Sequence, residues 1–147
     1  MKYISCSTTY LPLLCKALGF VCGPLAQCVV CTDENSTPIA GVLFDGYNGA
    51  VIQAHIWIDE VPSREWYAAI FDYPFNQLGV KKIVGQVKSS NLEARRLDMN
   101  LGFELEAQIA DYYEDGSSLM VYTMDRSQCK ILNSPKWARV VKKVKGG

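Results

Sequence analysis

The 147-residue sequence contains no run of about 20 apolar residues, which is the length that an α-helix needs to cross a bilayer. Its first residues, Met1-Lys2-Tyr3, do not lead into the apolar segment of a secretory signal peptide. These absences predict a soluble, intracellular protein, and we expect it in the cytoplasm. Because 49% of the residues are hydrophobic, the chain has enough apolar material for one well-packed domain.

Metal-ligand patterns are also scarce. The chain has one histidine, His55, and one CxxC spacing, Cys28-Val-Val-Cys31, without a second pair to complete a zinc site. Residues three apart on a strand point to opposite faces, so these two thiols are not expected to meet. We therefore predict no metal site and six reduced, mostly buried cysteines. A lone histidine on a strand is more often a structural residue than a base.

The zero net charge hides an asymmetry along the chain. Residues 125–147 hold seven Lys or Arg and one Asp, so this segment carries +6 and the preceding part carries −6. We predict a single domain over residues 1–124 and a basic C-terminal extension over 125–147 that folds back on the acidic body. A nucleic-acid partner is less expected, because Trp137 is the segment's only aromatic residue.

Side-chain periodicity and turn residues predict an α+β protein. Strands are expected at residues 2–6, 26–33, 39–47, 50–59, 80–87, 104–110 and 119–124, and helices at 10–19, 63–78 and 92–100. Asn48-Gly49 is typical of a hairpin turn. Gly19 is expected to end the first helix, Gly102 to end the third in the left-handed conformation, and Pro74 to kink or shorten the second.

The stretch "SSNLEARRLDMNLGFELE" carries a family resemblance. Asn91, Ala94, Leu101-Gly102-Phe103 and Glu106 occur in the order and spacing of the GNAT superfamily of N-acetyltransferases. The segments "FDYPFNQLGVKKIVGQV" before it and "DGSSLMVYTM" after it extend the likeness, which covers residues 52–124. The sequence is particularly similar to acetyltransferase-like proteins of tailed bacteriophages.

The resemblance implies a mixed, mostly antiparallel sheet with helices on both faces and a V-shaped cleft between two parallel strands. The family binds acetyl-CoA there, and the pantetheine arm pairs with a strand edge like an added strand. By this likeness, Ile56, Trp57 and Ile58 supply that edge.

The same likeness places the cofactor's pyrophosphate at the start of the helix near Ser63 and Arg64, where free N–H groups favour an anion. Asn91 would reach toward the pantetheine, although as a helix N-cap it needs no ligand to explain it. The chain departs from the family here, because "DEVPSREW" lacks the glycine-rich loop that closes around phosphate and brings Asp59 and Glu60 close to it.

The family's pattern also implies catalytic residues, and here the chain departs from it a second time. Many members place a tyrosine seven residues after the asparagine as the proton donor to the leaving thiolate, and here that position is Asp98. A carboxylic acid donates near neutral pH only if its pKa is strongly raised. Tyr112 or Tyr113 is the substitute donor, and Glu60 is the candidate base.

Two functions therefore remain open. The first is an acetyl-CoA-dependent N-acetyltransferase that acts on an amine-bearing small molecule or protein by direct attack. The second is a catalytically inactive phage virion or host-interaction protein with the same fold, which binds a phage or host partner. The first would act in the cytoplasm, in the host's if phage-encoded, and the second would belong to the virion.

Overall fold

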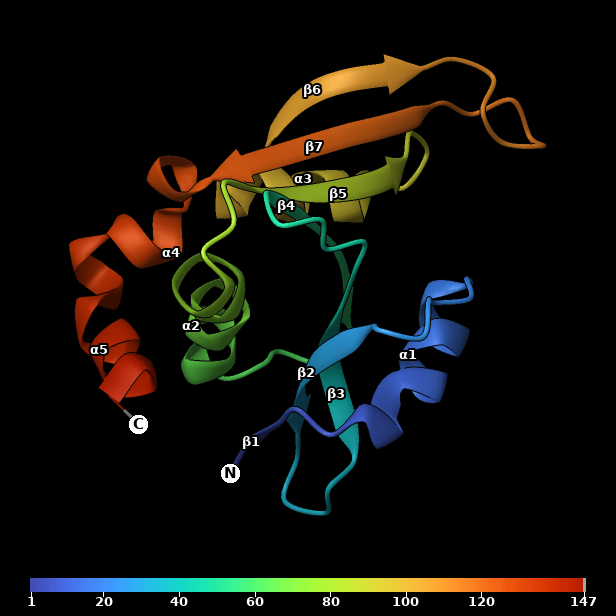
Figure 1. Ribbon diagram of the computed structural model, residues 1–147. Coiled ribbons are helices and arrows are strands. Elements are labelled where there is room, and N and C mark those ends of the chain that lie inside the picture. Colours follow the sequence, from blue (N-terminus) through green and yellow to red (C-terminus); the bar gives the residue numbers. More distant parts are fainter. Residues whose placement is uncertain (147) are drawn as a thin grey trace.

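A computed structural model of the protein describes residues 1–146 and shows one mixed sheet (Figure 1). Its strand order is β1-β2-β3-β4-β5-β7-β6, and every neighbouring pair is antiparallel except β4 and β5. The strands are β1 (Tyr3–Ser5), β2 (Gln27–Thr32), β3 (Pro38–Asp45), β4 (Val51–Ile58), β5 (Lys82–Lys88), β6 (Glu104–Ile109) and β7 (Leu119–Asp125). The predicted α+β fold with one parallel strand pair is confirmed.

The helices lie where the sequence predicts them, with an addition at the C-terminal end. They are α1 (Leu11–Leu18), α2 (Arg64–Asp72), α3 (Leu92–Leu101), α4 (Lys130–Asn133) and α5 (Ala138–Gly146). After α2 the chain continues as a π-helix, η2 (Tyr73–Leu78). Pro74 lacks the N–H for an α-helical hydrogen bond, so the α-helix ends just before it. The wider π turn then carries the helical path on to Gly79.

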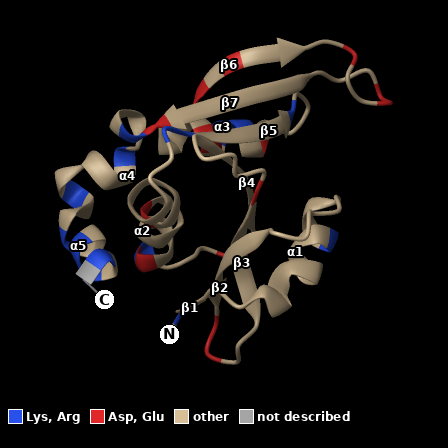
Figure 2. Ribbon diagram, in the orientation of Figure 1, with Lys and Arg blue, Asp and Glu red and all other residues tan. Residues whose placement is uncertain are grey.

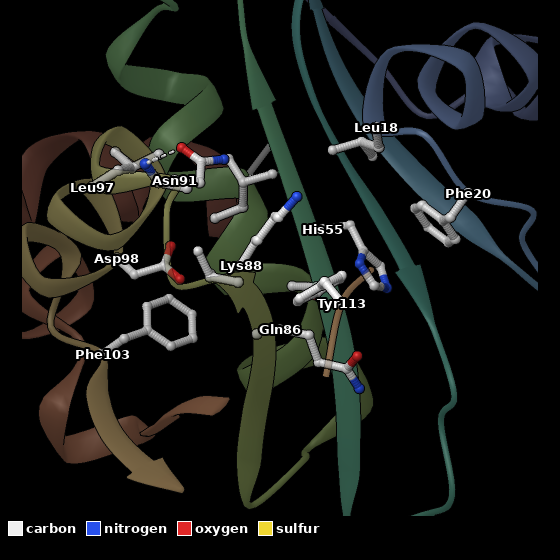
Figure 3. A pocket seen from close by; sticks show the side chains of 15 residues that line it. Leu18, Phe20, His55, Gln86, Lys88, Asn91, Leu97, Asp98, Phe103 and Tyr113 are labelled. Atoms are coloured by element: carbon white, nitrogen blue, oxygen red, sulfur yellow. Dashed lines mark hydrogen bonds between the residues drawn. The ribbon is translucent and has the colours of Figure 1, made fainter. Parts of the chain in front are cut away.

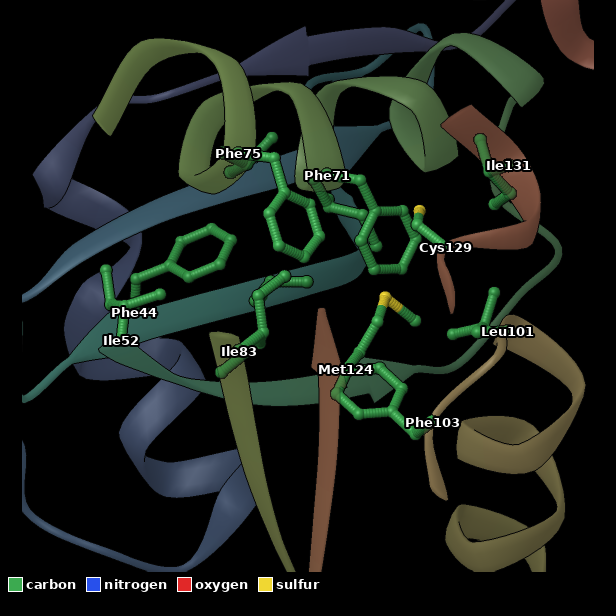
Figure 4. Close-up of a cluster of buried hydrophobic side chains, with 14 of the residues drawn as sticks. Phe44, Ile52, Phe71, Phe75, Ile83, Leu101, Phe103, Met124, Cys129 and Ile131 are labelled. Carbon is green, nitrogen blue, oxygen red and sulfur yellow. The ribbon is translucent and has the colours of Figure 1, made fainter. Parts of the chain in front are cut away.

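Each face of the sheet has its own apolar cluster. The main cluster joins α2, α3 and η2 to one face, where Phe71 and Phe75 lie in the same cluster as Ile83 and Met124 (Figure 4). A smaller cluster around Leu14 joins α1 to the other face. All six cysteines are free, but only Cys28, Cys31 and Cys129 are buried, so the prediction that most of them are buried is wrong. Helices therefore pack on both faces, as expected for this sheet.

Both ends of α3 are fixed by the residues that the sequence singles out. The Asn91 side chain accepts a hydrogen bond from the Ala94 N–H at 3.1 Å and caps the N-terminus. Gly102 ends the helix with φ 114°, and a Cβ built there would lie 2.1 Å from the Gln128 carbonyl oxygen. Glycine is thus required twice, by its backbone conformation and by the approach of the later chain.

The basic C-terminal segment lies against α2 (Figure 2). Trp137 packs edge-on against Tyr67 with ring centroids 6.0 Å apart, and Lys143 lies 3.5 Å from Glu65. Cys129 and Ile131 belong to the main cluster, so part of this segment shares the core of the preceding chain. No helix within residues 1–146 combines the length and apolarity that a membrane span requires.

Candidate active site

The candidate site is a cleft between the parallel strands β4 and β5, where the two strands separate like a fork. The two parallel strands pair only from Val51 to Gln53 on β4 and from Lys82 to Val84 on β5. Beyond these residues β4 stays paired with β3, and β5 stays paired with β7, so the two strands separate. A cleft of about 350 Å³ occupies the fork. The predicted V-shaped cleft between two parallel strands is therefore confirmed.

The cleft reaches both faces of the sheet, because alternate strand residues point in opposite directions. On the face of α3 it is lined by Ala54, Ile56, Gly85, Val87 and residues of the helix. On the face of α1 it is lined by His55, Gln86, Lys88, Leu18, Phe20 and Tyr113, as Figure 3 shows for most of these side chains. A molecule in the fork would contact mainly apolar residues on the α3 side and polar residues such as His55 and Lys88 on the α1 side.

Asp98 is the buried acid of the cleft. It comes from α3, is 5% exposed, and lies so close to Gly85 that a Cβ there would be 3.4 Å from Oδ2. Burial raises its pKa to about 7. No hydrogen bond to this carboxyl occurs within residues 1–146, where no polar side-chain atom is both fully buried and unpaired. The carboxyl oxygens therefore reach the cleft. Near neutral pH, about half of the molecules carry this carboxyl in its neutral, protonated form.

Asn91 lies on the same wall as Asp98. Its Oδ1 atom caps α3, while its side-chain NH₂ group has no acceptor within residues 1–146 (Figure 3). The structural role of an N-cap and a ligand-binding role are thus compatible in one side chain. The contact with a cofactor stays a prediction.

The three residues expected to form the cofactor edge of β4 differ in position. Ile56 lines the cleft. Trp57 packs with the α1 cluster on the opposite face, and Ile58 packs against the main cluster. Of the three, only Ile56 borders the cavity with its side chain.

The residues expected to bind pyrophosphate lie at the start of α2, away from the cleft lining. Ser63 accepts a hydrogen bond from the Trp66 N–H at 3.2 Å and caps the helix. The Arg64 guanidinium donates to the Lys136 carbonyl at 3.0 Å and stacks 4.7 Å from the centre of the Trp137 ring. The C-terminal segment therefore holds the arginine that was expected to face a phosphate.

Two other predicted residues also lie outside the cleft lining. Glu60 is exposed in the bend after β4, and Tyr112 is 53% exposed in the loop between β6 and β7. The neighbouring Tyr113 lines the cleft instead, with the Lys88 ammonium 5.3 Å from its ring centre. The catalytic roles of Glu60 and Tyr112 stay predictions.

Sequence reasoning overlooked that His55, which lines the cleft, is paired with an aspartate on β3. His55 Nε2 lies 3.0 Å from Asp45 Oδ1, across the β3–β4 hairpin. The hairpin register pairs Leu43 with His55 and Asp45 with Gln53, so Asp45 and His55 are diagonal neighbours on one face. Counting outward from Asn48-Gly49 would place Asp45 opposite Ile52, one residue out of the observed register and on the wrong face, so the hairpin turn alone could not have found this pair.

Comparisons with known proteins agree with the architecture. No protein-family model matches the chain, and no curated protein sequence matches it significantly. Its structure is similar to spermidine/spermine N-acetyltransferase SpeG from Vibrio cholerae in mutant form, with a TM-score of 0.71, 16% identity, and coverage of 92% of this chain and 99% of that one. It is also similar to a putative phosphinothricin N-acetyltransferase, with a TM-score of 0.64, 13% identity, and coverage of 85% and 98%. The chain has the GNAT fold.

Proposed function

We propose that the protein is an acetyl-CoA-dependent N-acetyltransferase that transfers the acetyl group to a primary amine. The observation that carries this proposal is Asp98, a buried carboxylic acid with a pKa of about 7 that lines a fork between two parallel strands. A buried carboxyl without a hydrogen bond adds nothing to the stability of the fold, and proton donation in the cleft accounts for its presence.

The fork offers a place for the pantetheine arm. Beyond Gln53, the edge of β4 that faces β5 has no strand partner within residues 1–146. An amide-bearing chain can pair with such an edge as an added strand. Ile56, Val87 and Ala94 give the cavity an apolar lining along this route. Apolar walls exclude water from a thioester and strengthen every polar contact made inside.

The start of α2 supports an anion despite the missing glycines. The backbone N–H groups of Arg64 and Glu65 have no acceptor within residues 1–146, as is usual for the first turn of a helix. Two lysines from opposite ends of the chain border this helix end. Lys2 donates to the Val61 carbonyl, and Lys143 reaches Glu65. These cations offset the nearby acidic residues, so we assign the cofactor's phosphates to this end of α2.

The chemistry is direct transfer. A neutral amine attacks the thioester carbonyl, and a β4 backbone N–H beyond Gln53 polarises its oxygen. When the carbon–sulfur bond breaks, Asp98 gives its proton to the leaving thiolate. A donor works best when its pKa lies near the working pH, and burial brings the pKa of Asp98 to about 7. An aspartate can therefore serve where many members of the family that the sequence resembles use a tyrosine.

The proposal is tested by measuring free CoA chromatographically while the protein is incubated with acetyl-CoA and a panel of primary amines. Asp98→Asn keeps the shape of the side chain but cannot donate its proton as an acid, so we expect a loss of about 100-fold or more in kcat. Glu104→Gln removes an exposed carboxylate on β6 and is the matched control. Equal rates for all three proteins would reject the role of Asp98.

A second candidate is a non-catalytic binding protein with the same fold, such as a phage virion or host-interaction protein. The engaged Arg64 and the glycine-free loop before α2 favour it. Thermal stability separates the two candidates. A ligand at one hundred times its dissociation constant adds about 2.7 kcal/mol, so millimolar acetyl-CoA should raise the Tm of an enzyme with micromolar affinity. A constant Tm would favour the binding protein.

A further inference from the structure

We propose that His55 takes the proton from the acceptor amine and that Asp45 holds its ring for this task. This inference rests on the proposed acetyl transfer and adds the base that the reaction needs. Glu60, the base expected from the sequence, is exposed and does not line the cleft, whereas His55 does.

The histidine ring is fixed from two sides. Its Nε2 atom lies 3.0 Å from Asp45 Oδ1, and its ring centre lies 4.3 Å from that of Phe20 (Figure 3). The side chains of His55 and Asp45 are 16% and 20% exposed, so solvent screens their contact only partly. Such a ring loses little freedom when it accepts a proton, which is what a positioned base requires.

The contact with Asp45 also sets the tautomer. An ionised carboxylate only accepts hydrogen bonds, so Nε2 carries the proton and Nδ1 keeps its lone pair. Within residues 1–146, Nδ1 has no hydrogen-bond partner, yet no polar side-chain atom there is both fully buried and unpaired. Nδ1 is therefore not fully buried, and its lone pair is free to accept a proton.

His55 and Asp98 act on different sides of the fork. His55 lies on the α1 face of β4, while Asp98 comes from α3 on the other face. The nitrogen–carbon bond forms as the amine proton passes to Nδ1, and the carbon–sulfur bond breaks as Asp98 protonates the thiolate. The histidine then loses its proton to water and Asp98 regains one, so protons balance over a turnover.

Other titratable groups surround the pair. Asp45 faces His55 from β3, and Cys22 lies near Asp45 from the loop after α1. The remaining titratable groups that line the cleft are Lys88, Asp98 and Tyr113. The ammonium of Lys88 is paired with Asp115 at 2.8 Å, so its charge is largely compensated before it acts on His55.

The test compares pH–rate profiles of the wild type, His55→Ala, Asp45→Asn and the control Glu104→Gln. Activity that needs a neutral His55 falls at low pH as the ring becomes protonated, and His55→Ala should remove this acidic limb and lower kcat about 100-fold, with little change in KM. Added imidazole should restore part of the rate. Asp45→Asn should also be slow, because an amide that donates to Nε2 puts the proton on Nδ1.

Two results would overturn the inference while leaving acetyl transfer intact. One is a His55→Ala variant that keeps both the wild-type rate and the wild-type fall in activity at low pH. The other is loss of that limb in Glu60→Gln alone. An inactive wild type with every amine would instead remove the proposed function, and with it the need for a base.

A readout without turnover is available because His55 is the only histidine in the chain. Nitrogen-15 NMR of the neutral ring should show the proton on Nε2 in the wild type and a shift of it toward Nδ1 in Asp45→Asn. A wild-type ring protonated on Nδ1 would contradict the proposed base.

Discussion

Replacing Asp98 with asparagine should change how stability depends on pH. Burial raises the pKa of Asp98 from an ordinary 3.8 to about 7 in the folded protein. The folded state therefore binds this proton more tightly than the unfolded state does. The stability contributed by the protonated group is fully present below the unfolded pKa, and it is lost as pH rises through the folded pKa. The window runs from about pH 4 to just above pH 7.

The size of the effect follows from the shift. Roughly three pKa units at 1.36 kcal/mol each correspond to about 4 kcal/mol between the two ends of the window. The amide introduced by Asp98→Asn cannot ionise, so the variant should lose this pH dependence. The unpaired amide also costs some stability, but that cost does not vary with pH.

The assay is urea unfolding of the wild type, Asp98→Asn and the control Glu104→Gln at a series of pH values from 4 to 8. The stability of Asp98→Asn relative to the wild type should rise by about 4 kcal/mol across this range. Glu104 is exposed, so its variant should follow the wild-type curve. A constant difference between Asp98→Asn and the wild type would show that Asp98 is ionised throughout, and the reasoning about the proton donor would fail.

Three further substitutions, with Gly79→Ala as the control for the first, test the packing that supports the site. Gly102→Ala should cost about 3 kcal/mol or more in urea unfolding, because its Cβ would meet the Gln128 carbonyl at 2.1 Å, whereas Gly79→Ala, with open space around it, should cost about 1 kcal/mol. Equal costs would refute the close approach. Ser63→Ala should lower unfolding free energy by about 1 kcal/mol through loss of the α2 cap, and no loss would mean that the cap is unimportant. Trp66→Phe should cost about 1–3 kcal/mol because the Val29 carbonyl loses its partner at 3.0 Å, and a neutral result would contradict this.

Much of the fold could be predicted from local signals. Alternating apolar residues and the turn at Asn48-Gly49 located the β3–β4 hairpin, and Gly19 and Gly102 located helix ends. These features depend on residues close together in the sequence. The packing of α5 on α2 was predicted only as a basic segment folding back, because it depends on contacts such as Lys143 with Glu65, which lie far apart along the chain.

The candidate site was predictable to a lesser degree. The resemblance to the acetyltransferase family directed attention to Asn91 and Asp98, and both line the cleft. The raised pKa of Asp98 could not be read from the sequence, because it results from burial beneath β5. The partnership of His55 with Asp45 depends on strand register, which is why a lone histidine on a strand was interpreted as structural.

The central claim is that the fork between β4 and β5 accepts the acyl-CoA arm. Calorimetric titration of acetyl-CoA into the wild type, Ala94→Trp and Ala107→Trp tests it most directly. Ala94 lines the cleft, whereas Ala107 is exposed on β6. A tryptophan at position 94 would therefore fill the fork, and one at position 107 would leave it open. We expect one molecule bound by the wild type and by Ala107→Trp, and none by a folded Ala94→Trp. Equal binding by all three proteins, or none by the wild type, would contradict the account.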